Sequence, residues 1–296
     1  MISYSIVLPA RNEAQNLRHL LPAIRALHPQ AELIVVDDGS RDDTAAVALA
    51  AGARCVSHPY SMGNGAAVKS GARQASHDII VFMDADGQHD PALIQPLLDK
   101  LDQGYEMAVG ARVWNSHASL GRRWVNFIYN RLAGYMAARR VDDLTSGFRA
   151  VRARHFLRFL YLLPNGFSYP TTCTMAFFRS GLPVAYVPFT ARTRGGRSHI
   201  RLLQDGLRFF MIILKIGALF SPMRLFLPVS ALLFITGWAY YGYTFALFHR
   251  FTNMSTLLIL SSVLTFLIGI LAELVSALHY READFERRLV RRDDIP

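Results

Sequence analysis

The sequence of 296 residues contains only two cysteines, Cys55 and Cys173. So few cysteines exclude a disulfide-stapled fold and a cysteine-rich zinc module, and we expect both thiols to be reduced packing residues. The hydrophobic fraction of 52% excludes intrinsic disorder, which combines low hydrophobicity with high net charge. The first residues also lack the basic stretch and cleavage site of a signal peptide, so none is expected.

Positive charge is in excess, and it is unevenly distributed along the chain. The net charge is +10, but residues 1–109 carry a net −5 and residues 110–215 carry a net +14. An acidic first third followed by a basic middle predicts a site for a cation and then a site for an anion. Nucleic acid is the simplest partner for so basic a chain. We do not expect it, because the basic block runs directly into membrane-type sequence.

Two long apolar runs follow the basic block. Residues 225–248 have no charged side chain, and as a helix they would span about 36 Å, enough for a hydrocarbon core of about 30 Å. Residues 255–280 form a second run that is interrupted by Glu273 and His279. We predict a hairpin that crosses the bilayer twice, with buried core helices as the alternative. Glu273 is a candidate functional carboxylate, and snorkelling or pairing within an oligomer is the alternative.

The flanks of this hairpin predict its orientation and its approach to the membrane. Lysine and arginine are frequent before and after the hairpin, whereas its connecting loop has Arg250 alone, so both ends are expected on the cytoplasmic side. Cations recur near a seven-residue spacing between Ile200 and Phe220. This pattern predicts an amphipathic helix in the membrane interface, with an ordinary amphipathic helix of the globular domain as the alternative.

Strand and helix patterns alternate through the first 110 residues. The expected strands are Tyr4–Pro9, Glu32–Val36, Arg54–Ser57, Asp78–Met83 and Met107–Gly110. The expected helices are Glu13–Ala26, Asp42–Ala50, Gly65–Ala75 and Pro91–Asp102. This alternation predicts a Rossmann-like, mostly parallel sheet with helices on both faces, in which ligands bind beyond the carboxyl ends of the strands.

The polar residues that follow these strands suggest a metal and a nucleotide. Asp84 and Asp86, followed by Gln88, offer the oxygen ligands that Mg²⁺ or Mn²⁺ prefers, and Mg²⁺ commonly adds substrate phosphates. Asp37 and Asp38 can accept hydrogen bonds from a base or ribose.

A glycine-rich segment suggests a close approach to the same ligand. The loop Gly63-Asn64-Gly65, with Lys69 one helical turn later, can approach the ligand closely because it carries no bulky side chains. The segment lacks the Gly-Lys-Ser/Thr of a P-loop.

Taken together and in this order, the motifs of residues 3–199 resemble those of the family-2 glycosyltransferases of GT-A fold. More narrowly, they are similar to the dolichyl-phosphate mannose synthase-like branch. The matching stretches are Ile6–Glu13, Val35–Ser40, Gly63–Lys69, Met83–His89, Gly110–Arg112 and Asp143–Arg149. The resemblance implies metal-dependent, inverting transfer of one hexose from a nucleotide sugar, of the GDP-mannose or UDP-glucose type, to a polyprenyl phosphate at the cytoplasmic face of the cell membrane.

This resemblance organises the chain into four expected parts. They are a GT-A catalytic domain at 1–199, an amphipathic juxtamembrane helix at 200–222, a transmembrane hairpin at 223–281 and a cytoplasmic tail at 282–296. A homo-oligomer is left open, because some relatives assemble through their membrane helices. Undecaprenyl phosphate is the expected carrier by analogy with bacterial members, with dolichyl phosphate as the alternative.

The resemblance and the residue patterns together assign the site. The expected nucleotide site consists of Pro9, Ala10, Asn12, Glu13, Asp37, Asp38, Gly63, Lys69, Asp84 and Ala85. Asp86 and Gln88 are the expected ligands of Mg²⁺ or Mn²⁺. The expected contacts to the acceptor phosphate are Arg112, Arg122, Asn126, Ser146, Arg149 and Arg194. Asp86, Arg112 and Asp143 are the expected catalytic residues.

The acceptor decides whether a general base is needed. A phosphate monoester, with a second pKa of about 6, is already mostly dianionic at neutral pH, so its oxygen can attack without losing a proton. Asp143 is therefore expected to orient an arginine, with a role as base as the alternative.

Three rival functions remain. A processive polysaccharide synthase would need a Gln-x-x-Arg-Trp motif, and Leu120 stands at the position of its glutamine. A nucleotidyltransferase would need a glycine-rich N-terminal loop with lysine, which residues 9–13 lack. The third rival is a non-catalytic membrane scaffold that binds sugar nucleotide or anionic lipid.

Overall fold

The structure is a computed structural model that describes residues 3–113, 130–136, 139–166, 168–190, 214 and 217–293, with side chains up to residue 278. It divides into two compact units, Met1–Leu202 and Leu203–Pro296. The expected boundary near residue 200 stays a prediction, since the residues around it lie outside the described ones.

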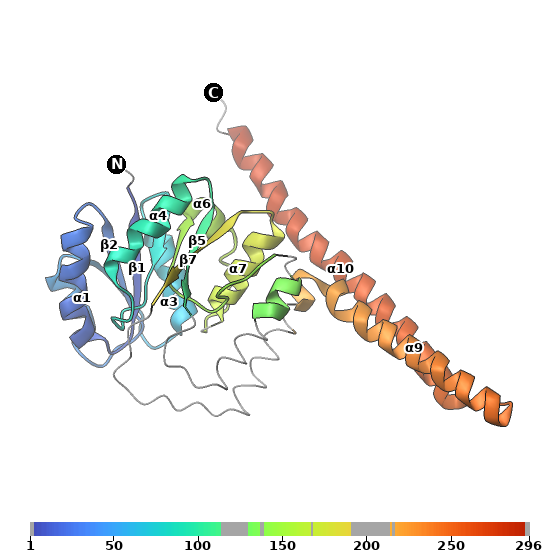
Figure 1. The fold of residues 1–296 in the computed structure, drawn as a ribbon. Helices are drawn as coiled ribbons and strands as arrows, with labels where there is room; N and C mark the ends of the chain where they lie inside the picture. Colours follow the sequence, from blue (N-terminus) through green and yellow to red (C-terminus); the bar gives the residue numbers. More distant parts are fainter. Residues whose placement is uncertain are drawn as a thin grey trace. The chain divides into compact units, whose positions relative to one another are not determined.

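The described residues of the first unit form a seven-stranded sheet (Figure 1). Its strands are β1 (Ser5–Ala10), β2 (Glu32–Asp37), β3 (Arg54–Ser57), β4 (Ile79–Phe82), β5 (Met107–Arg112), β6 (Arg149–Arg152) and β7 (Val184–Phe189). They lie in the order β3-β2-β1-β4-β6-β5-β7. β6 pairs antiparallel with β4 and β5, and the other pairs are parallel. The predicted α/β fold with a mostly parallel sheet is confirmed.

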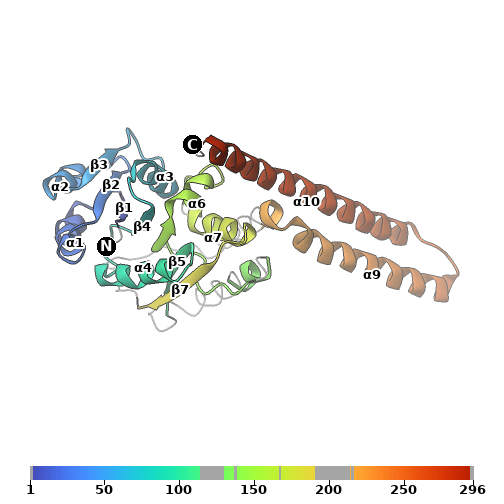
Figure 2. The same cartoon turned by 90° about the horizontal axis from the view of Figure 1, so that it is seen from above.

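Helices cover both faces of this sheet (Figure 2). They are α1 (Ala14–Leu27), α2 (Thr44–Ala50), α3 (Asn64–Gln74), the 3₁₀ turn η1 (Pro91–Leu93), α4 (Ile94–Asp102), α6 (Ala153–Arg158) and α7 (Tyr169–Arg179). Successive strand residues point to opposite faces, so Ile6 and Leu8 join the core under α1 and α4, whereas Val7 faces α3. Gly71 lets α3 approach the sheet closely, because a Cβ there would lie 2.3 Å from the Val7 side chain.

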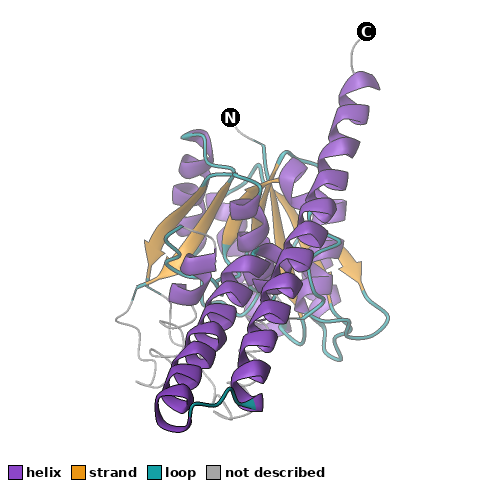
Figure 3. Cartoon of the chain, turned by 90° about the vertical axis from the view of Figure 1, so that its right-hand side faces the viewer, coloured by secondary structure: helices purple, strands orange, loops and turns teal. Residues whose placement is uncertain are grey.

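In the described part of the second unit, two long apolar helices form a hairpin (Figure 3). They are α9 (Pro222–Phe248) and α10 (Asn253–Asp293), and α9 and the stretch Asn253–Leu278 are each long and apolar enough to cross a membrane. His249 ends α9 in a left-handed conformation, with its N–H donating to the Phe245 carbonyl. The expected pair of apolar helices is confirmed, and residues 282–293 continue α10.

Small residues at heptad spacing bring the two helices together. The buried positions of the hairpin include Ser230, Gly237 and Thr244 on α9, and Ser255, Ser262, Gly269 and Ser276 on α10. A seven-residue repeat keeps one helical seam facing its partner, and small residues allow close approach of helices in membranes. A Cβ on Gly269 would lie 2.8 Å from the Cβ of Phe226. Ser230 Oγ donates to the Ser262 carbonyl at 3.0 Å across the seam.

Glu273, a residue of α10, lies beside the N-terminus of α9. Its Oε2 accepts a hydrogen bond from the Met223 backbone N–H at 3.3 Å. The first N–H groups of a helix have no partner within the helix, and the helix dipole favours negative charge there. Glu273, on α10, therefore joins the two helices at the end of the hairpin where α9 begins, away from the connecting loop.

The predicted interface helix falls largely outside the described residues. Of positions 200–222, the structure describes 214 and 217–222. The amphipathic character of this segment stays a prediction.

Candidate functional site

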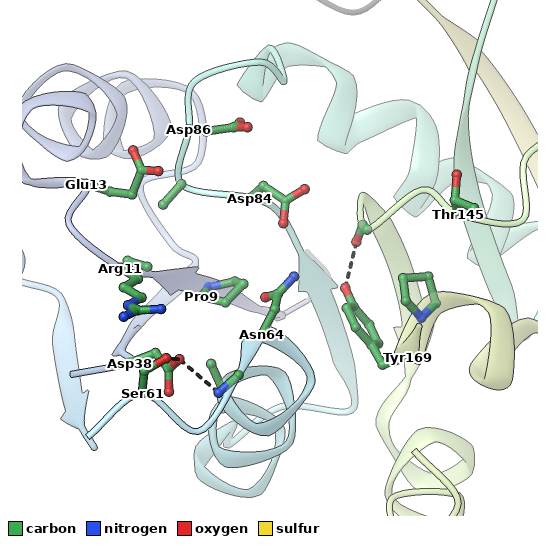
Figure 4. Close-up of a pocket in the computed structure, with 16 residues that line it drawn as sticks. Pro9, Arg11, Glu13, Asp38, Ser61, Asn64, Asp84, Asp86, Thr145 and Tyr169 are labelled. Carbon is green, nitrogen blue, oxygen red and sulfur yellow. Dashed lines mark hydrogen bonds between the residues drawn. The ribbon is translucent and has the colours of Figure 1, made fainter. Parts of the chain in front are cut away.

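A cavity of about 430 Å³ opens where β1, β2 and β4 end, as expected for a parallel sheet (Figure 4). Four carboxylates line it: Glu13, Asp38, Asp84 and Asp86. Arg11 lines it as well. This excess of negative charge favours a bound cation over a bare anion.

Asp38 fixes the loop that begins α3. Its Oδ1 accepts hydrogen bonds from His58 Nδ1 at 2.8 Å and the Met62 N–H at 2.7 Å. Its Oδ2 accepts from Ser61 Oγ at 2.8 Å and the Gly63 N–H at 3.0 Å. Burial raises the pKa of Asp38, but these four donors outweigh it and hold the pKa below its ordinary value. Asp38 thus lines the cavity and, by these hydrogen bonds, fixes the loop that precedes α3.

Asp37 and Asn12 stabilise neighbouring turns. Asp37 Oδ1 accepts the Ser40 N–H at 2.9 Å. Asn12 has a left-handed φ of 55°, and its Oδ1 accepts the Arg41 N–H at 2.8 Å. Neither side chain is among those that line the cavity, so contact of these two residues with a nucleotide stays a prediction.

Asp84 and Asp86 are the candidate ligands for a divalent metal. Both line the cavity, and Asp86 Oδ1 accepts the Gln88 N–H at 3.1 Å. Within the described part of the chain, no three His, Cys, Asp or Glu side chains gather in a metal-binding group. Mg²⁺ is commonly held by one or two carboxylates together with substrate phosphates and water. The two carboxylates fit a cation whose remaining ligands come from substrate phosphate and water. Gln88, the other expected ligand, is not among the residues that line the cavity.

Arg112 is held in a fork by Asp143. Its Nε donates to Asp143 Oδ2 at 2.8 Å, and its terminal nitrogen donates to Asp143 Oδ1 at 3.1 Å and to Thr145 Oγ1 at 2.6 Å. Burial raises the pKa of Asp143, but the hydrogen bonds and charge of Arg112 outweigh it, so the net pKa is low. Such a carboxylate accepts a proton poorly, which favours the orienting role over that of a base.

Arg149 does not fit the expected contact with the acceptor phosphate. It lies on β6 with 0% of its surface exposed. Its guanidinium donates to the Pro170 carbonyl at 3.1 Å, to Thr174 Oγ1 at 3.3 Å and to the Ser146 carbonyl. Ser146 is itself buried. Arg149 therefore joins the loop before β6 to the start of α7, because β6 points its side chain under α7.

Lys69 does not line the cavity either. Its Nζ donates to the Leu163 carbonyl at 3.0 Å and to Asn165 Oδ1 at 2.5 Å. The sequence pattern placed this lysine near a bound ligand, but here it holds another segment of the chain. Pro9, Ala10, Gly63 and Ala85 do line the cavity.

Several expected residues lie outside the described part of the chain. They are Arg122, Asn126 and Arg194. Conversely, the cavity includes residues that the sequence analysis did not assign. They are Arg11, Ser61, Asn64, Ala67, Thr145, Gly147, Tyr169 and Pro170. Five of them belong to the matching motifs and could have been found there: Arg11, Asn64, Ala67, Thr145 and Gly147. The other three, Ser61, Tyr169 and Pro170, lie in none of these motifs.

Comparison with known proteins gives two family matches. Residues 5–175 match the family model described as Glycosyl transferase family 2. Residues 221–278 match the model described as GtrB C-terminal hairpin.

Individual relatives extend these matches. The chain is 31% identical over 205 residues to a polyprenol monophosphomannose synthase of Mycolicibacterium smegmatis, covering 64% of this chain and 77% of that protein. It is 33% identical over 188 residues to an undecaprenyl-phosphate 4-deoxy-4-formamido-L-arabinose transferase of Pseudomonas savastanoi, covering 57% of this chain and 55% of that protein. The chain thus spans about half the length of the second relative.

A solved structure shares the fold. Glucosyl-3-phosphoglycerate synthase from Mycobacterium tuberculosis, in complex with Mn²⁺, UDP-glucose and phosphoglyceric acid, superposes with a TM-score of 0.59 at 25% sequence identity. The match covers 73% of this chain and 79% of that one.

Proposed function

The chain belongs to glycosyltransferase family 2, and we propose that it transfers one hexose from a nucleotide sugar to a polyprenyl phosphate at the cytoplasmic face of the cell membrane. The donor is of the GDP-mannose or UDP-glucose type, and the acceptor is undecaprenyl or dolichyl phosphate. The names of the relatives support a lipid-phosphate acceptor, and the bound UDP-glucose of the solved structure supports a nucleotide-sugar donor.

The proposal depends mainly on one juxtaposition. Thr145 lines the acidic cavity and also accepts a hydrogen bond from Arg112. The side chain of Arg112 is 41% exposed, so its guanidinium can also meet a phosphate oxygen while Asp143 holds it in place. A donor site and a phosphate-binding arginine therefore share one wall.

The chain's own residues divide the work of the reaction. Asp84 and Asp86 would hold a divalent cation, which supplies charge neutralisation for the departing nucleoside diphosphate. Arg112 binds the acceptor phosphate and orients its oxygen behind the anomeric carbon, so that attack inverts that carbon. The acceptor is already ionised, so Asp143 acts on Arg112 rather than on a proton.

The hairpin supports a location at the membrane. α9 and the apolar part of α10 can each cross a bilayer, and the arginines before and after them support a cytoplasmic position for both ends. A membrane-anchored enzyme meets a lipid acceptor without extracting it.

A transfer assay tests the proposal. Full-length protein in detergent is mixed with labelled GDP- or UDP-sugars, Mg²⁺ or Mn²⁺, and a short polyprenyl phosphate. We expect a lipid product that carries a single sugar, and loss of that product in Asp86→Ala with unchanged thermal unfolding. Product from no common donor would contradict the proposal. Binding of nucleotide without turnover would favour the scaffold, and long sugar chains would favour the processive synthase.

A further inference from the structure

The segment Leu163–Gly166 lies against the start of α3. A Cβ on Gly63 would lie 2.4 Å from the Asn165 carbonyl oxygen, and a Cβ on Gly65 would lie 2.1 Å from the Pro164 carbonyl oxygen. The Ala66 N–H, one of the first N–H groups of α3, donates to the Asn165 carbonyl at 3.1 Å. The two glycines therefore accommodate another segment of this chain.

Lys69 closes this contact one helical turn later. Its ammonium donates to the Leu163 carbonyl at 3.0 Å and to Asn165 Oδ1 at 2.5 Å. Hydrogen bonds from a charged donor are stronger than those between neutral groups. We call this arrangement of Lys69 with Leu163 and Asn165 the Lys69 clamp.

The two segments that the clamp joins each continue into residues that line the donor cavity. Gly63, directly before α3, lines the cavity together with Asn64 and Ala67 of that helix, and Tyr169 and Pro170 line it from the start of α7. Figure 4 shows Asn64 and Tyr169 at the same cavity. Leu163 and Asn165 lie shortly before α7 in the chain, so a bond from Lys69 to them limits how far the two helix starts can separate.

We propose that Lys69 is a positioning residue that holds the starts of α3 and α7 at the separation that the nucleoside diphosphate of the donor requires. This inference rests on the proposed function, because it takes the cavity as the donor site. Lys69 touches neither the cavity nor Arg112, so its loss should weaken donor binding without slowing transfer from the filled site.

The test is direct binding of nucleotide to the full-length protein. Lys69→Met keeps the aliphatic stem and removes the ammonium. Lys100→Met on α4 is the matched control, because Lys100 is half-buried like Lys69 and its Nζ donates to Gln103 Oε1, only three residues later in the chain, at 2.9 Å. Calorimetry with UDP and with GDP, each with Mn²⁺, gives Kd, and transfer assays give the donor KM and kcat.

We expect Lys69→Met to raise both the Kd of the nucleotide and the donor KM about tenfold, while kcat stays within about twofold. A tenfold change corresponds to the loss of roughly one charged hydrogen bond. Lys100→Met should bind nucleotide as the wild type does. Lys69→Arg, which keeps a charged donor, should recover part of the affinity. Equal Kd values for wild type and Lys69→Met would overturn the clamp, even if the melting temperature falls.

A second variant separates the clamp from general destabilisation. Asn165→Ala removes one acceptor from an exposed side chain and should weaken Kd about threefold. Combined with Lys69→Met it should add nothing further, because both changes break the same bond. Fully additive effects would contradict the clamp. If the wild type itself binds neither UDP nor GDP, the proposed function fails and the clamp with it.

Discussion

Asp143→Asn tests the orientation of Arg112 with the least change in shape. The substitution keeps the size of the side chain but removes the charge and replaces one acceptor oxygen with an amide that also donates. The asparagine can no longer accept both hydrogen bonds from Arg112, which measure 2.8 and 3.1 Å in the wild type. Arg112 loses the fork that aims its guanidinium at the acceptor phosphate.

The size of the effect follows from the exposure of the pair. Breaking a buried ion pair costs about 3 to 5 kcal/mol, whereas an exposed pair contributes about 0.2 to 1 kcal/mol. The side chain of Asp143 is 9% exposed and that of Arg112 is 41% exposed, so this pair lies between the two cases. We expect a loss of about 2 kcal/mol, or about 30-fold, in kcat/KM for the acceptor.

The assay titrates polyprenyl phosphate at saturating donor and measures the Kd of UDP and GDP in parallel. Nucleotide affinity should stay unchanged. Asp142→Asn is the matched control, because Asp142 is the neighbouring carboxylate and pairs with Arg140 instead. Since the pKa of Asp143 is low, the acidic limb expected in the rate between pH 5 and 8 is that of the acceptor phosphate, and it should be the same in the wild type and in Asp143→Asn. If Asp143→Asn lowered kcat/KM more than about a thousandfold and also removed an acidic limb that the wild type shows, Asp143 would be a general base and the orienting role would be refuted.

Three further predictions follow from the described contacts. Gly147→Ala should raise the Mn²⁺ concentration needed for half-maximal activity about tenfold, because the new Cβ would lie 3.1 Å from Asp84 Oδ2; an unchanged metal titration would argue against Asp84 as a ligand. Gly269→Leu should lower the melting temperature of the hairpin, since even a Cβ meets Phe226 at 2.8 Å, whereas the exposed Leu271→Ala should not; equal melting of both would contradict the heptad seam. The low folded pKa of Asp38 contributes stability above its unfolded pKa of about 3.9, and this is lost as pH falls through the folded value. Between pH 7 and pH 3 the free energy of unfolding, measured by chemical denaturation, should therefore fall less in Asp38→Asn than in the wild type.

The regular first half of the fold was accessible from the sequence because its signals are local. The strand Arg54–Ser57 was predicted with its observed ends, and the ends of β1, β2 and β5 differ from prediction by one or two residues. The alternation of apolar runs with polar loops also located Asp38, Asp84 and Asp86 at one cavity. The alternation of strand and helix patterns is interrupted at the basic stretch, so β6 and β7, which lie beyond it, are not predicted from the sequence.

The expected site residues that the structure holds away from the cavity have partners distant in the chain. Lys69 bonds to Leu163 and Asn165. Arg149 is covered by α7. A motif gives the type of a side chain and its local conformation, but the direction in which β6 points Arg149 depends on its pairing with β4 and β5. The pairing of Glu273 with the start of α9 likewise follows from hairpin packing that no local pattern encodes.

The most direct measurement of the central claim compares two acceptors that differ only in their phosphate. Full-length protein with labelled nucleotide sugar and Mn²⁺ is given either a short polyprenyl phosphate or the matching polyprenol, and released nucleoside diphosphate and sugar-lipid are both counted. We predict one nucleoside diphosphate per sugar-lipid with the phosphate, and none of either with the alcohol. Equal transfer to the alcohol, or none to the phosphate, would contradict a donor cavity that shares its wall with a phosphate-binding Arg112.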